Sequence, residues 1–256
     1  MSSQTISTPA VVEPVRKPGA LRRTGLAAAG FLACALPTVF TINITRMLLV
    51  GELTEHRFHQ LTGQGLVLFV LWLGGLVPLL RAGWSGRRPS SAAGLLHLTF
   101  MATGVVCAAA ATGGGAPALV GVIVVTGGLV WLALPLRPRL RLPVQVDPVL
   151  APLALVAAAV STPYVLDQIS LQNAATGHHA HNPHFFDMAW LVTALVVLAV
   201  LAAVLPSARR LGVLAGAGLA FTGAMGVLLA ADRPFTVAAL VVGAAIALVS
   251  ARRVRG

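Results

Sequence analysis

Residues 188–206 (MAWLVTALVVLAVLAAVLP) form an apolar stretch without a single charged side chain. A helix rises about 1.5 Å per residue, so a stretch of this length nearly covers the roughly 30 Å hydrocarbon core of a bilayer. Its residues are apolar on every side and do not alternate with polar ones, as the strands of an outer-membrane barrel would. The stretch therefore predicts a transmembrane helix.

Seven further stretches of this kind occur along the chain, which is 57% hydrophobic and only 10% charged. Soluble domains carry about 25% charged residues, so the composition itself is typical of a membrane protein. We predict an all-α fold, a polytopic transmembrane helical bundle with eight spans. The expected spans are residues 25–50, 61–82, 92–112, 116–136, 149–170, 188–206, 210–230 and 234–251.

The N-terminal residues 1–20 are rich in Ser, Thr and Pro, and this composition predicts a disordered tail. Residues 21–256 then form one transmembrane domain, since the connections between spans are too short for a soluble domain. The basic pair Arg22–Arg23 precedes the first apolar run, as in a signal peptide. That run continues to about Val50, however, which favours a first transmembrane helix.

Successive connections between the expected spans are alternately rich and poor in arginine and lysine. Fifteen of the 18 basic residues fall in the tail, the even-numbered connections and the C-terminus, and three fall on the opposite side. The positive-inside rule then predicts that both termini are cytoplasmic. The same rule explains the net charge of +11 without a nucleic-acid partner, and the abundance of Arg, Ala and Gly indicates a bacterial inner membrane.

Residues 24–141 and 148–256 can be aligned as two halves of four spans each. Pro37 and Thr41 in the first half match Pro163 and Asp167 in the second half. An even number of spans predicts a parallel repeat, related by an axis along the membrane normal. The alternative is that residues as frequent as Ala, Leu and Val align by chance.

The longest connection, residues 171–187, contains the motif GHHAHNPHFFD at residues 177–187. Imidazole and carboxylate groups are the ligands that zinc and copper accept in proteins. The motif therefore predicts a metal site on the extracytoplasmic side. Its candidate ligands are His178, His179, His181, His184 and Asp187.

A second polar segment precedes the second span. It holds Glu52, Glu55, His56 and His59, at spacings of three and four residues. On a helix such spacings make side chains neighbours on one face. If the two halves are related by a repeat, this segment faces the histidine motif, and together they offer Zn or Cu a common site.

Three more polar residues lie at the outer ends of the first and fifth spans: Arg46, Tyr164 and Asp167. A carboxylate close to the hydrocarbon is costly unless it is paired. We expect Pro163 to bend its helix so that Asp167 faces the bundle, with Arg46 as its partner. All three are therefore candidate functional residues.

These features support several functions. The leading one is a multi-pass membrane protein that binds a divalent metal ion for metal handling or transport. The alternatives are a membrane-embedded enzyme acting on a lipid or small molecule at the outer leaflet, a structural or assembly subunit without metal, and a proton sensor that uses its histidines. The sequence identifies no catalytic residues and, apart from the bilayer and a metal ion, no partner.

Overall fold

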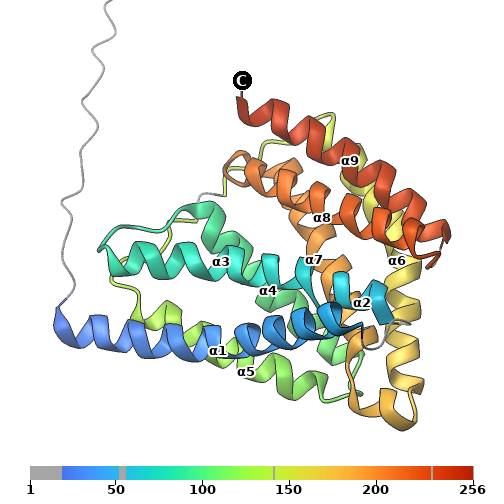
Figure 1. Cartoon of the computed structure of the whole chain (residues 1–256). Coiled ribbons are helices and arrows are strands. Elements are labelled where there is room, and N and C mark those ends of the chain that lie inside the picture. The colour runs from blue at the N-terminus through green and yellow to red at the C-terminus, as the bar shows by residue number, and fades with distance from the viewer. Residues whose placement is uncertain (1–18, 52–55, 141, 232, 256) are drawn as a thin grey trace, which may run out of the picture.

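The computed structural model describes residues 19–51, 56–140, 142–231 and 233–255. Within these ranges the regular elements are all helices (Figure 1). The helices are α1 (Ala20–Val50), α2 (Arg57–Leu61), α3 (Leu66–Trp84), α4 (Ser91–Ala110), α5 (Ala116–Ala133), α6 (Leu150–Ala174), η2 (Gly177–His181), α7 (His184–Val204), η3 (Pro206–Ala208), α8 (Arg209–Leu228) and α9 (Arg233–Arg255). The tail predicted over residues 1–20 falls almost wholly outside the described residues.

Eight helices are long and apolar enough to cross a membrane, by their length and composition. They correspond one to one with the predicted spans, and α2 and α3 together form the second. The prediction of an all-helical fold with eight helices long and apolar enough to span a membrane is thus confirmed. The main difference is at the histidine motif, where α6 continues to Ala174 and α7 begins at His184. The connection between them is therefore shorter than predicted.

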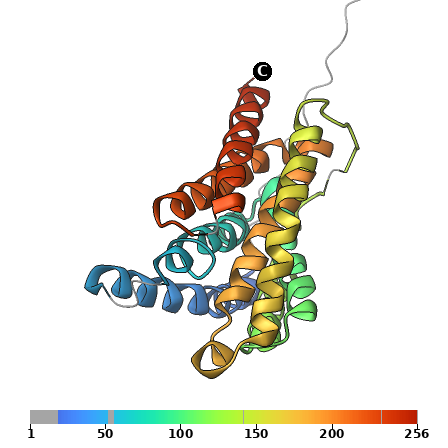
Figure 2. The same ribbon diagram turned by 90° about the vertical axis from the view of Figure 1, so that its right-hand side faces the viewer.

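The long helices contact one another in two groups of four. In the first group α1 and α4 each pack against both α3 and α5. In the second group α7 and α9 each pack against both α6 and α8, and α6 runs alongside α7 (Figure 2). The two groups meet mainly where α4 packs against α7. Each group thus forms a closed ring of four consecutive spans.

The core at the junction of the groups is aromatic. The ring centroids of Phe100 and Trp190 are 4.4 Å apart, and the indole N–H of Trp190 donates to the carbonyl oxygen of Phe100 at 2.9 Å. Trp72 stacks on the other side of Phe100 at 5.6 Å. These buried rings fix α3, α4 and α7 relative to one another, because large aromatic side chains bury the most area per residue.

The α8–α9 contact depends on small residues. A Cβ added at Gly216 would collide with the backbone of Ala247, and one added at Gly223 would collide with the backbone of Leu240. Helices in membranes associate closely where such residues remove the side chain between them. The glycines therefore permit the tightest helix pair of the second ring.

The connections gather at two ends of the molecule. At the basic end, defined by residues 85–90, 134–140, 142–149, 205–208 and 252–255, the guanidinium of Arg88 donates to the carbonyl oxygen of Arg137 at 2.7 Å. At the histidine end, defined by residues 56–65, 111–115 and 175–187, the amide of Gln64 donates to Asn182 at 2.7 Å. The arginine-rich connections and the histidine segments thus lie apart.

Candidate metal centre

Two short structures carry the histidines of the candidate site. His56 is the residue that precedes α2, and His59 lies within that five-residue helix. The hydroxyl of Thr62, which follows α2, donates to the carbonyl oxygen of Phe58 at 2.6 Å and contacts the sulfur of Met188 at 3.1 Å. These contacts attach α2 to the first turns of α7.

The start of α7 is held from the opposite side by α6. The side-chain oxygen of Gln172 accepts the backbone N–H of Phe186 at 3.1 Å, and Gln172 is 1% exposed. This N–H belongs to the first turn of α7, where backbone donors have no partner inside the helix. Gln172 therefore fixes the helix start that carries His184.

His56, His59 and His184 form a compact group. One ring nitrogen from each lies within 4.8 Å of the other two. Three atoms at such separations have a common point within about 2.8 Å of each, whereas a zinc–imidazole bond measures about 2.0–2.1 Å. Shifts of under about 1 Å per side chain would thus bring all three nitrogens to bonding distance.

A fourth imidazole borders the group. The ring centroid of His179, in η2, lies 4.8 Å from that of His184 and 5.6 Å from that of His56. The Nδ1 atom of His59 is buried and has no hydrogen-bond partner among the described residues. Buried polar atoms are nearly always satisfied, so this imidazole nitrogen inside a histidine cluster is a candidate metal-binding atom.

The other predicted ligands are placed differently. His181 is exposed at the end of η2. Asp187 is 7% exposed and lies one helical turn beyond His184, outside the three-histidine group. Glu52, Glu55 and the side chain of His178 lie outside the described part of the structure.

The expected orientation of Asp167 is wrong. The helix α6 packs through the face that carries Tyr164 and Gln168, both buried, whereas Asp167 is exposed. Arg46 is also exposed, on a helix of the other group, and no ion pair joins it to Asp167. The buried face of α6 carries small and polar residues such as Ala157, Ser161 and Gln168, and Asp167 lies off this face despite Pro163.

Tyr164 has a packing role. Its ring stacks on that of Phe235 in α9, with centroids 3.9 Å apart and planes inclined by 6°. The pair belongs to a small buried cluster with Phe58 and Met188. Tyr164 therefore contributes to the buried packing that contacts Phe58 of α2.

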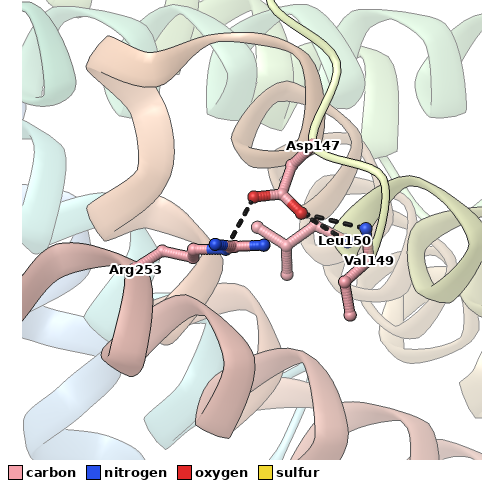
Figure 3. A network of polar contacts seen from close by, with 4 residues as sticks. All are labelled: Asp147, Val149, Leu150 and Arg253. Atoms are coloured by element: carbon pink, nitrogen blue, oxygen red, sulfur yellow. Dashed lines mark hydrogen bonds and ion pairs between the residues drawn. The ribbon is translucent and has the colours of Figure 1, made fainter. Parts of the chain in front are cut away.

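Sequence reasoning did not assign a role to Asp147 (Figure 3). Its carboxylate accepts the backbone N–H groups of Val149 and Leu150 at 3.0 and 3.1 Å, and pairs with Arg253 at 3.0 Å. Burial raises the pKa of Asp147, but these hydrogen bonds and the charges of Arg253 and Arg209 outweigh it and leave the pKa below its ordinary value. The signal was an Asp two residues before the predicted span 149–170, where a carboxylate can accept the free N–H groups of a helix start.

A histidine cluster of this kind can bind a borderline metal ion. Three histidines leave a fourth position of a tetrahedral ion for water, for His179 or for a substrate. Comparisons with protein-family models, with curated proteins and with solved structures found no match. The assignment of a function therefore rests on the geometry of the site itself.

Proposed function

We propose that this chain is a multi-pass protein of a bacterial inner membrane that binds a divalent metal ion, zinc or copper, at its extracytoplasmic face. His56, His59 and His184 are the proposed ligands. The observation that carries the proposal is the convergence of three ring nitrogens within 4.8 Å from segments more than 100 residues apart in the sequence. The buried, unpartnered Nδ1 of His59 supports it.

The remaining predicted ligands take outer roles in this proposal. His179 is the nearest candidate for the fourth position, since its ring lies beside those of His56 and His184. Metal-bound histidines usually donate their second N–H to a carboxylate. Glu52 and Glu55 lie a few residues before α2 in the sequence, so we propose this orienting role for them, whereas His178 and His181 are given no part in holding the ion.

The proposed orientation places both termini in the cytoplasm. Its support is the alternation of arginines along the chain, together with the contacts that gather the basic connections. The backbone N–H groups of Gln145 and Asp147 donate to the carbonyl oxygens of Val204 and Ala203. The connections that follow α5 and α7 thus lie side by side at the basic end, as a cytoplasmic face requires.

We also propose that residues 24–141 and 148–256 are parallel repeats. The support is that each half forms a ring in which consecutive spans contact each other and the last contacts the first. The two histidine segments then occupy corresponding places, each after the first span of its half. Chance similarity of apolar helices would not explain this shared contact pattern.

Binding and handling of the metal is favoured over its transport. Polar groups lie at the histidine end, and the cavity beside them is also lined by the large side chains of Leu68, Trp72, Ile123 and Trp190. A transport path needs polar groups near the middle of the membrane, commonly at broken helices. The open fourth position beside a cavity favours a metal-dependent enzyme as the second candidate.

The test is metal analysis of the detergent-purified chain after dialysis against zinc or copper and removal of loosely bound ions. We expect about one ion per chain in the wild type and in His181→Ala, which removes an exposed histidine outside the group. We expect none in the double variant His59→Ala/His184→Ala. Equal metal content in all three proteins, or none in the wild type, would overturn the proposal.

A further inference from the structure

An aromatic cavity of about 180 Å³ lies beside the histidine group, between α1, α3, α5 and α7. Phe40, Phe69, Trp72 and Trp190 contribute to its walls. Its polar lining includes Asp187 and the carboxamides of Gln60, Gln64 and Asn182. The cavity thus combines aromatic walls with a polar margin, which is typical of a small-molecule site.

Two polar groups that line this cavity have no partner. The carboxyl group of Asp187 forms no hydrogen bond or ion pair with any residue that the structure describes, although the side chain is about nine-tenths buried. The indole N–H of Trp72 likewise has no hydrogen-bond partner in the described ranges. By contrast, the indole N–H of Trp190 is already bonded to Phe100. The cavity therefore offers a ligand one acceptor and one donor.

We propose that this cavity binds the ring of a phenol or hydroquinone, with the ring hydroxyl donating to Asp187. A cavity of about 150 Å³ holds benzene, so one of about 180 Å³ accommodates a ring with one or two hydroxyl groups. Aromatic rings pack favourably against the faces of Phe and Trp. A hydroxyl both donates and accepts, which suits Asp187 and Trp72 together, whereas an ammonium group only donates.

The site goes beyond the proposed metal function and does not depend on it. His56 and His184 also line the cavity, but the proposed acceptor, Asp187, lies outside the three-histidine group and the aromatic rings supply the rest of the contact. Two kinds of molecule carry such a hydroxyphenyl ring: a water-soluble phenol, and a lipid-soluble quinol with the ring as its head group. A lipid quinol would leave its tail among the membrane-facing side chains.

The experiment is fluorine NMR of 4-fluorophenol and 4-fluoroanisole, titrated with the full chain in maltoside detergent with a chelator present. Empty micelles give the blank for each compound. The two probes share the fluorinated ring, but the anisole carries a methyl group on its oxygen and cannot donate. Since one hydrogen bond contributes about 1 kcal/mol, we expect the phenol to bind about fivefold more tightly. Equal affinity, or no binding of the phenol beyond the micelle blank, would overturn the proposal.

Displacement and substitution complete the test. We expect Asp187→Leu to abolish the preference for the phenol and Asp167→Leu, which changes an exposed carboxylate, to retain it.

Hydroquinone and decylhydroquinone are then added as competitors. Displacement by both supports a soluble ligand, and displacement by the decyl compound alone supports a lipid quinol. The site would be contradicted if folded Asp187→Leu still preferred the phenol, or if neither competitor displaced 4-fluorophenol from the wild type. If Asp187→Leu does not fold, the comparison of phenol and anisole on the wild type decides the test.

Discussion

Two buried carboxylates, one at each end of the molecule, differ in their hydrogen-bond and ion-pair partners. At the basic end, Asp147 accepts two backbone hydrogen bonds and pairs with Arg253. At the histidine end, Asp187 faces a cavity and has no partner within the described ranges. Both are less than a tenth exposed.

The difference separates a structural acid from a functional candidate. A buried carboxylate with its hydrogen bonds complete stabilises the fold, whereas one left unsatisfied costs free energy. The orphaned Nδ1 of His59 lies at the same end as Asp187. Asp187 and the Nδ1 of His59 therefore lie at the same end of the molecule, where we propose binding.

The largest effect is expected on metal affinity. His59→Ala removes one of three proposed ligands, and we expect zinc affinity to fall by at least about 100-fold, since even the loss of an outer partner costs 10–100-fold. Competition with a chromophoric chelator measures this. Asp147→Asn, at the basic end, should leave the affinity unchanged. A decrease of similar size in Asp147→Asn would show that the two ends are not separate.

The next effect concerns the stability of the basic end. Asp147→Ala removes the cap of α6 and the partner of Arg253, and should lower the free energy of unfolding by about 1–2 kcal/mol. The melting temperature in detergent, followed by circular dichroism, reports the change. An unchanged melting temperature would mean that the pairing at this end contributes nothing.

The contribution of Asp147 should also depend on pH. Its pKa in the folded protein is lowered, so its stabilisation is fully present above the unfolded value of about 3.9 and is lost as pH falls through the folded pKa. The difference in melting temperature between wild type and Asp147→Asn should be constant from about pH 7 to 5 and shrink below about pH 4. A difference as large at pH 3 as at pH 7 would contradict this.

The smallest effect should have the opposite sign. Asp187→Asn replaces an unpartnered buried carboxyl group by a neutral one of the same shape, so in metal-free protein we expect a stability gain of up to about 1 kcal/mol. Asp167→Asn, at an exposed position, is the control and should leave the melting temperature unchanged. Destabilisation by Asp187→Asn comparable to that of Asp147→Asn would give both acids a structural role.

The helices could be predicted from the sequence because an apolar run of about 20 residues has few other stable structures in a membrane. The meeting of the two histidine segments was predicted from the repeat alignment, and the structure brings His56 and His59 to His184. The choice among the histidines could not be predicted. It depends on η2, whose turns expose His181 and bring His179 beside the group.

The orientation of a side chain on an apolar helix was equally hard to predict. Polar and apolar residues are not segregated along α6, so nothing in its sequence indicated that Tyr164 and Gln168 would be buried and Asp167 exposed. The cavity could not be predicted from the sequence for a related reason, since its walls come from four helices that are distant in the sequence. Packing between helices, and not local pattern, decides both.

The most direct test of the central claim is X-ray absorption at the zinc edge of the zinc-loaded, detergent-purified chain. We predict a first shell with three imidazole nitrogens at about 2.0–2.1 Å and one further light ligand. The imidazole scattering should diminish in His184→Ala. A shell of oxygen atoms alone, without imidazole scattering in the wild type, would contradict a histidine metal centre at this end of the molecule.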